Sequence, residues 1–376
     1  MPTFKQLGLA LLGPSIVSAG PLNRNIAKRD GSDYKDNAVC TADQLMRNYQ
    51  VHDTGLWGKD LWWQSGNFMS ALATLTSLNS DYLSEHGDVF VNTYDTATGY
   101  GNYVNFLDAF YDDEGWWGNA WLDVYDVTQN QTYLDAAITI YNDIIGGLGT
   151  PCGGIWWDKN QSYVAAISNG LYIELAAGIA ARVGSDQASD YLSHAVDGWN
   201  WFFSVGLVGN DSMVSDGVDK GNNCAPVGAK FTYNQGVILG AAAELYKATN
   251  NQTYLEQAAA LANASSAAGS SVTDSNGILH DGCDESDNCD ETAEMFKGPY
   301  MRGLRKLQLA YPHDNWKNFI ITNAQSIWNN DLYFEQTDSG SVCNVGEDWA
   351  GPYNSTNEVT QGAALDALNA ALAVTQ

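Results

Sequence analysis

"TYNQGVILGAAAELYKATNNQTYLEQAAALANAS", residues 232–265, contains the two kinds of helix that decide the fold. The first half begins at a polar signature with a glycine and continues with small and apolar residues all round, which is typical of a helix packed on several faces. The second half begins at a polar turn, "NNQTY", and continues as an amphipathic helix. The stretch therefore predicts one inner helix followed by one outer helix.

The outer-helix pattern recurs along the chain. The segment "YDVTQNQTYLDAAITIYNDI", which starts at Tyr125, shares "NQTYL" with the stretch above, and weaker copies surround Tyr82, Tyr191 and Trp316. The aligned aromatic residues lie mostly about 60 residues apart, a spacing long enough for two helices and a substantial loop. The segment "TADQLMRNYQ", residues 41–50, is a candidate for a sixth outer helix.

The inner-helix pattern occurs six times. Each copy has a glycine near its start, and these glycines are Gly66, Gly115, Gly170, Gly236, Gly298 and Gly362. Six inner and six outer helices in alternation predict an all-α fold, an (α/α)6 toroid or barrel, in a single domain over residues 30–376. A generic helical bundle is the alternative, because helix packing rules alone do not force a ring to close. In the toroid all six signatures meet at one mouth.

The N-terminus has the pattern of a secretory targeting signal. Residues 1–19 contain Lys5, a short apolar run and a small-residue end, which predict a signal peptide. Residues 20–29 end in the pair Lys28-Arg29 and form a candidate propeptide. An ordinary amphipathic helix is the alternative, although Pro14 would interrupt it. Six Asn-x-Ser/Thr sequons also favour a secreted glycoprotein, and they lie at Asn130, Asn160, Asn210, Asn251, Asn263 and Asn354.

Six cysteines without CxxC or zinc-ligand spacing favour disulfides over a metal. Only the pair Cys283–Cys289 follows from sequence proximity, and the other pairings stay open. The acidic loop 281–290 suggests calcium, but it lacks EF-hand spacing, so a solvated loop held by a disulfide is favoured. We expect no metal and no cofactor.

The net charge of −27 disfavours nucleic acid and anionic membranes as partners, because both require a basic surface. A neutral sugar is indifferent to this charge. The C-terminal residues form an amphipathic pattern rather than a lipid-anchor signal, so we expect no membrane anchor. We also expect a monomer.

"NFLDAFYDDEGWWGNAW", residues 105–121, carries the candidate catalytic pair Asp112 and Asp113. One aspartate before an apolar helix is explained as an N-cap, but a second is not. Consecutive residues on a helical turn would hold their carboxyls about 5–6 Å apart, the separation that retaining glycosidases use. Helix N–H groups favour ionisation of one carboxyl, and its charge would raise the pKa of the other. The sequence does not say which residue has which role.

Three tryptophan pairs accompany the inner-helix signatures, at positions 62–63, 116–117 and 156–157. Indole rings suit the C–H faces of a sugar as well as they suit a core. For a single tryptophan the core is favoured, whereas the cluster of three pairs indicates a sugar site.

The motifs "YDDEGWWGNAW", "WWQSGNF", "GGIWWD", "SNGLY", "TYNQG" and "FKGPYMRGL" resemble glycoside hydrolase family 76, the α-1,6-mannanases, from about Cys40 to the C-terminus. The resemblance implies an (α/α)6 barrel that cleaves α-1,6-mannan with retention, Asp112 as the nucleophile and Asp113 as the general acid/base. The family also contains lipid-anchored fungal wall enzymes thought to transfer mannan-linked anchors onto wall glucan, but this chain lacks the anchoring-tail signal, so we expect an endo-acting, secreted hydrolase. The alternatives are a cell-wall transglycosylase of the same family and a toroid that binds glycan without cleaving it.

Nine further residues near the signatures are candidates for substrate binding: Trp62, Gln64, Trp116, Trp117, Asn169, Tyr233, Asn234, Gln235 and Lys297. For the asparagines and glutamines, helix capping is an equal contender, and Lys297 could instead pair with a nearby acid. A helical barrel that binds magnesium diphosphate is disfavoured, because its Asp-rich motif needs an acid at position 116, where this chain has Trp116.

Overall fold

The computed structural model describes residues 33–376 except 51–52, 59–60, 100–102, 287 and 338–339. This part of the chain is mostly helical, with thirteen α-helices and a few short strands. The predicted signal peptide (1–19) and candidate propeptide (20–29) lie outside the described residues. Among the described helices, none has the combined length and apolar character needed to cross a membrane.

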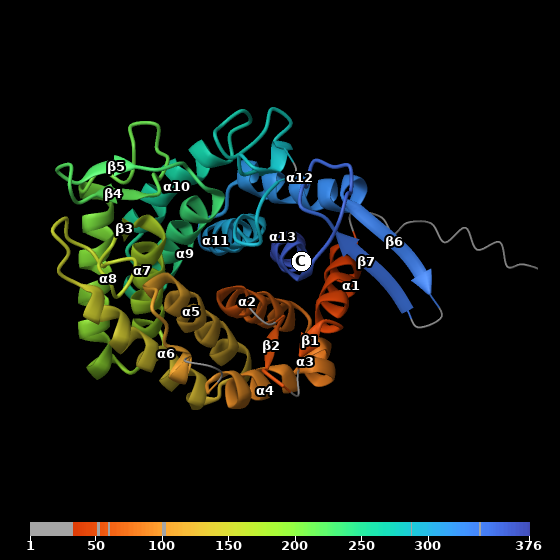
Figure 1. Cartoon of the computed structure of the whole chain (residues 1–376), viewed down its shortest axis with the longest axis horizontal. Helices are drawn as coiled ribbons and strands as arrows, with labels where there is room; N and C mark the ends of the chain where they lie inside the picture. Colours follow the sequence, from red (N-terminus) through yellow and green to blue (C-terminus); the bar gives the residue numbers. More distant parts are fainter. Residues whose placement is uncertain (1–32, 51–52, 59–60, 100–102, 287, 338–339) are drawn as a thin grey trace, which may run out of the picture.

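Six helices form the inner layer, and each contacts the next along the chain until the last returns to the first. Figure 1 shows them around the centre of the molecule. Each begins at one of the predicted glycine signatures. They are α2 (Trp62–Leu78), α5 (Tyr111–Thr128), α7 (Ala166–Ala180), α9 (Thr232–Thr249), α11 (Lys297–Ala310) and α13 (Glu358–Thr375).

The remaining helices lie outside this layer (Figure 1). They are α1 (Tyr34–Met46), α3 (Ser80–His86), α4 (Asp88–Ala97), α6 (Gln131–Ile144), α8 (Ser185–Ser204), α10 (Thr253–Ser265) and α12 (Asp314–Asn330). The predicted outer helix at Tyr82 is in fact two helices, because the chain breaks at Gly87. A Cβ at Gly87 would lie 2.5 Å from the Leu83 carbonyl oxygen, so this position suits only glycine.

The signature glycines explain how the inner helices approach one another. In every inner helix, a Cβ built on this glycine would press against the following inner helix. At Gly236 it would overlap the backbone of Tyr300, and at Gly362 it would overlap the ring of Phe68. The other four meet Trp117, Leu171, Val237 and Ala363. One small residue per helix, always on the side of the next helix, therefore permits a closed cycle of close-packed helices.

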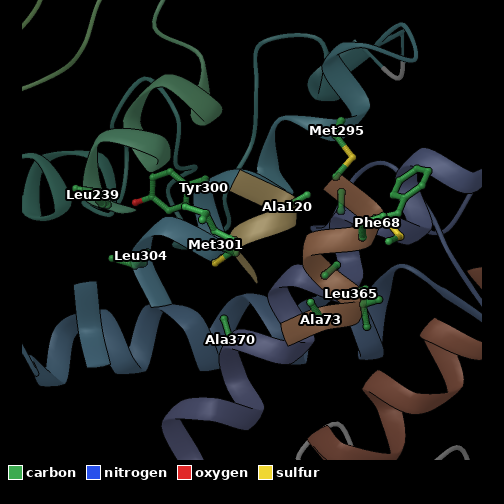
Figure 2. Close-up of a cluster of buried hydrophobic side chains, with 14 of the residues drawn as sticks. Phe68, Ala73, Ala120, Leu239, Met295, Tyr300, Met301, Leu304, Leu365 and Ala370 are labelled. Atoms are coloured by element: carbon green, nitrogen blue, oxygen red, sulfur yellow. The ribbon is translucent and has the colours of Figure 1, made fainter. Parts of the chain in front are cut away.

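Side chains from several inner helices fill the space between them. Figure 2 shows Phe68 and Ala73 of α2 near Leu365 and Ala370 of α13, with Met301 of α11 beside them. All five are buried. These apolar side chains pack where neighbouring inner helices meet, whereas the cavities between the inner helices are lined partly by charged side chains such as Asp123 and Lys306.

The strands are short and antiparallel. They form the pairs β1 (Tyr49–Gln50) with β2 (Leu56–Trp57) and β6 (Leu332–Thr337) with β7 (Gly340–Val345), and a three-stranded sheet of β3 (Val164–Ala165), β4 (Gly217–Asp219) and β5 (Ala225–Val227). The segments "GGIWWD" and "GILHDG" take part only in isolated bridges, such as Leu148 with Ile155 and Thr273 with Leu279. Single 3-10 turns are η1 (Val104–Phe106), η2 (Ile145–Gly147), η3 (Asp284–Ser286) and η4 (Ala293–Met295).

Three disulfides connect the six cysteines. The predicted pair Cys283–Cys289 is confirmed, and the pairings that the sequence left open are Cys40–Cys343 and Cys152–Cys224. The first of these joins α1 to β7 across 303 residues of chain. All six sequon asparagines are exposed.

Removing the long-range disulfide is expected to destabilise the fold. Replacing Cys40 and Cys343 together by alanine removes the crosslink and so raises the conformational entropy of the unfolded chain. We expect the free energy of unfolding to fall by about 2–4 kcal/mol. Denaturant titration of the double variant against the unmodified protein measures this. An unchanged midpoint would mean that α1 and β7 are held by packing alone.

Candidate active site

A pocket of about 450 Å³ opens where the inner helices begin. Its walls come from the first turns of α2, α5, α7 and α9, from the segment before α11, and from loops between them. The lining residues are Trp63, Phe110, Asp112, Asp113, Trp116, Trp157, Tyr163, Ala165, Ile167, Asp216, Tyr233, Thr292 and Phe296. Five of the six predicted signatures contribute to this lining, whereas none of the lining residues comes from α13, so the expectation that all six meet at one mouth holds only in part.

Asp112 and Asp113 lie in the first turn of α5 and both line the pocket. Neither is the N-cap, which is Phe110. The Asp108 carboxylate accepts the N–H groups of Ala109 and Phe110, which precede the helix and are not its free N–H groups. Helix capping therefore does not explain the pair.

The two carboxyls differ in ionisation. Burial raises the pKa of Asp112, but the Trp157 indole N–H and the free N–H groups of the α5 N-terminus oppose that rise. Burial also raises the pKa of Asp113, and the neighbouring charge of Asp112 raises it further. Asp112 consequently ionises first, and Asp113 holds its proton to higher pH.

Glu114 fixes the start of α5 from the side away from the pocket. Its buried carboxylate accepts the Asp108 N–H at 2.8 Å and pairs with Lys159 at 2.7 Å. Lys159 also pairs with Asp143 of α6 at 2.7 Å. Burial raises the pKa of Glu114 to about 8, although the ion-paired ammonium of Lys159 opposes this rise. These bonds connect the helix that carries the acids to the loop that follows α6.

That loop delivers Trp157 to the pocket. The Tyr111 N–H donates to the Trp157 carbonyl at 2.8 Å, and the Trp157 N–H donates to the Tyr163 carbonyl at 2.8 Å. The indole Nε1–H then donates to Asp112 Oδ2 at 3.0 Å. Trp157 thus contacts the first acid directly and has a backbone fixed on both sides.

Asp216 forms the opposite polar wall. It accepts hydrogen bonds from the Tyr163 hydroxyl and from Asn234 Nδ2, both at 3.1 Å. Burial raises its pKa. The sequence reasoning did not find Asp216 or Tyr163, since they lie in irregular segments at β4 and β3 without a recognisable motif.

Of the predicted site residues, Asp112, Asp113, Trp116 and Tyr233 line the pocket. Asn234 is buried behind it and reaches it through Asp216. Trp62, Gln64 and Trp117 are buried in the core and do not line it. Trp62 stacks on Tyr103 with centroids 4.0 Å apart. The structure therefore places these three side chains behind the pocket wall rather than on it.

Three more residues predicted to bind substrate instead form hydrogen bonds or an ion pair within the protein. Asn169 exchanges hydrogen bonds with the backbone of Ile155, and Gln235 does so with the backbone of Val214. Each side chain holds the backbone of an adjacent loop against an inner helix, a structural role that differs from the helix capping offered as the alternative. Lys297 is buried and forms an ion pair with Asp284. This pair also neutralises part of the acidic loop 281–290.

Residues 33–376 match the family model for glycosyl hydrolase family 76. The chain is 26% identical over 327 residues to mannan endo-1,6-α-mannosidase DCW1 of Candida glabrata, a match that covers 80% of this chain and 67% of that protein. It is 24% identical over 294 residues to mannan endo-1,6-α-mannosidase DFG5 of Candida albicans, covering 70% and 63%. Part of each relative therefore has no counterpart in the match.

Solved structures share the fold. Dfg5 from Chaetomium thermophilum, solved with glucosamine, superposes with a TM-score of 0.78 at 18% identity, over 93% of this chain and 92% of that one. An inactive variant of an α-1,6-mannanase from a Salegentibacter species, with two consecutive aspartates replaced, superposes with a TM-score of 0.76 at 22% identity, over 91% and 99%. With a family match over nearly all described residues, the chain belongs to glycosyl hydrolase family 76.

Proposed function

We propose that this protein is a secreted, endo-acting mannanase that hydrolyses α-1,6-mannosidic linkages with retention of configuration. The observation that carries the proposal is the pair Asp112 and Asp113 in one aromatic pocket, with different ionisation. The names of the DCW1 and DFG5 relatives support the linkage. The Salegentibacter protein, bound to an α-1,6-mannotetraose when two consecutive aspartates are replaced, supports an adjacent pair as the catalytic unit.

In the first chemical step, the Asp112 carboxylate attacks the anomeric carbon of a bound mannose unit. Asp113 gives its proton to the departing glycosidic oxygen, so the C–O bond breaks as an acyl–mannose ester forms. The ionisation order suits these roles, because Asp112 is the acid that loses its proton first.

In the second step, Asp113 is a carboxylate and accepts a proton from water. That water attacks the anomeric carbon, and the ester bond to Asp112 breaks to release the sugar. Both acids return to their starting states. Trp63, Trp116 and Trp157 supply flat apolar faces along the pocket, which suit the C–H faces of mannose.

Loss of the Trp157 N–H is expected to change the pH profile. Because this N–H lowers the pKa of Asp112, Trp157→Phe raises that pKa, and the acidic limb of kcat/KM moves to higher pH. A hydrogen bond to a charged group corresponds to a shift of about one to two pH units. The control is Trp63→Phe, which alters a pocket indole stacked on Trp116. An equal shift in both variants would disprove the specific role of Trp157.

The direct test of the proposal uses unbranched α-1,6-mannan, with α-1,2- and α-1,3-linked mannobiose as controls. We expect short α-1,6-oligosaccharides from the polymer and no cleavage of the controls. Binding of mannan without turnover would favour the glycan-binding alternative. Transfer is distinguished from hydrolysis by adding an acceptor oligosaccharide, whose hydroxyl would replace water in the second step and yield products longer than the substrate.

The proposal extends to the fold, the location and the oligomeric state of the protein. We propose that the closed cycle of inner helices and the outer helices form an (α/α)6 toroid, in one catalytic domain over residues 30–376. The three disulfides and the exposed sequons support a secreted, extracellular glycoprotein. We further propose that it acts as a monomer.

A further inference from the structure

We propose that a second pocket beside the catalytic one binds additional mannose units of the same α-1,6-linked chain, an inference that rests on the proposed function. This outer pocket has a volume of about 640 Å³. Its lining residues are Ala229, Lys230, Phe231, Ser271, Asp281, Gly282, Cys283, Asn288, Cys289, Asp290, Thr292, Ala293 and Phe296. Two of them, Thr292 and Phe296, also line the catalytic pocket.

Three aromatic rings connect the two pockets. Tyr233 lines the catalytic pocket, Phe231 lines the outer pocket, and Phe296 lines both. The rings of Tyr233 and Phe296 stack with centroids 3.9 Å apart, and those of Phe231 and Phe296 are 5.5 Å apart. The stack covers the facing surfaces of Tyr233 and Phe296, so the three rings form a continuous aromatic row that is an apolar wall between the two pockets. The C–H surfaces of a sugar chain can lie along such a wall.

The charge of the outer pocket favours a neutral ligand. Lys230 is the only cationic residue of its lining, and its ammonium pairs with Asp211. The lining also includes Asp281 and Asp290, so an anionic ligand such as a phosphate would meet net negative charge. An uncharged mannan segment has no such penalty.

A disulfide, an ion pair and hydrogen bonds hold parts of the outer pocket's wall in place. The Cys283–Cys289 disulfide closes one wall, and Asp284, between these cysteines, pairs with buried Lys297. The two oxygens of Asp281 accept the N–H and the hydroxyl of Thr232 at 2.9 and 2.5 Å. A preformed wall of this kind loses little conformational entropy when a ligand binds. Lys297, predicted as a substrate contact, would then act by holding this wall.

An endo-acting enzyme must accommodate chain beyond the mannose units next to the cleaved bond. Because the pockets share Phe296 and Thr292, they are adjacent, and a chain bound at the catalytic pocket has the outer pocket beside it. Longer substrates should therefore gain contacts that short ones cannot reach, and kcat/KM should rise with chain length.

The test compares kcat/KM for a mannohexaose and a mannotriose, both α-1,6-linked. Phe231→Ala removes one ring of the aromatic row, and Ala229→Trp fills the outer pocket without removing any packed side chain. We expect each variant to lower the hexaose-to-triose ratio by about tenfold. Leu309→Ala is the matched control, because Leu309 is 54% exposed and lines neither pocket. Its ratio should equal that of the unmodified protein.

An unchanged ratio in both Phe231→Ala and Ala229→Trp would overturn the inference, as would an equal loss on both substrates. Absence of turnover by the unmodified protein would contradict the proposed function instead. Calorimetric titration of the hexaose against the same proteins would then decide the inference, which requires weaker binding by Ala229→Trp than by Leu309→Ala.

Discussion

Replacing Asp112 by asparagine is expected to lower kcat/KM on α-1,6-mannan by on the order of 10⁴-fold or more, because the amide cannot form the ester intermediate. Asp113→Asn removes the proton donor, and we expect a loss of about 10²–10⁴-fold. Both effects are measured from reducing-end release on unbranched mannan. Binding of the substrate should persist in both variants, since the pocket walls are unchanged.

The unfolding temperature of each variant distinguishes a loss of catalytic chemistry from a loss of the folded structure. A carboxyl whose pKa is raised on folding destabilises the folded protein above its unfolded pKa, so removing that carboxyl relieves a cost at neutral pH. Asp112→Asn and Asp113→Asn should therefore unfold at the same temperature as the unmodified protein or higher. The control is Asp126→Asn at the other end of α5, where the carboxylate pairs with Arg182. Full activity in Asp112→Asn would refute the assigned nucleophile.

The second large effect concerns the contact between α9 and α11. A Cβ at Gly303 would overlap the carbonyl of Gly236, and a Cβ at Gly236 would overlap the backbone of Tyr300. Backbone cannot move aside as a side chain can, so either glycine-to-alanine change must separate the two helices. We expect the free energy of unfolding to fall by at least about 3 kcal/mol in each variant.

Denaturant titration measures this loss, with Gly146→Ala as the matched control. A Cβ at Gly146 has only the Tyr111 hydroxyl within 4 Å, at 3.9 Å, which is ordinary contact. We expect only a small change in the free energy of unfolding for Gly146→Ala. If Gly303→Ala were as stable as Gly146→Ala, close approach of glycine backbones would not be what closes the inner layer.

The helical fold was predictable because its two signals are local. Small residues at helical spacing identified the inner helices, and the recurring turn identified most of the outer ones. The break at Gly87 was not predictable, although the carbonyl that a Cβ there would meet belongs to Leu83, only four residues earlier, because a single glycine in a helical pattern does not by itself end the helix. Two disulfide pairings were open for a different reason, since they depend on contacts between distant segments.

The tryptophan pairs show where sequence reasoning about the site ends. Each pair is divided between the core and the pocket: Trp63, Trp116 and Trp157 line the pocket, whereas Trp62, Trp117 and Trp156 are buried behind it. Adjacent side chains point in different directions, by about 100° on a helix. The sequence identified the cluster but not which member of each pair faces the sugar.

The buried amides illustrate a second limit. Asn169 and Gln235 occupy the expected place near the mouth, yet their side chains bond to loop backbone rather than face the pocket. Asp216 faces the pocket although no pattern distinguishes it from other loop acids. Which polar groups are left for substrate depends on which loops need to be held, and this is decided only in three dimensions.

Following cleavage of an unbranched α-1,6-mannotetraose by proton NMR tests the central claim most directly. If Asp112 forms an ester that water resolves with help from Asp113, the first reducing sugar to appear has the α configuration, and the β form grows in later by mutarotation. Initial release of the β anomer would contradict the account, because it requires a single displacement by water rather than a covalent intermediate on Asp112.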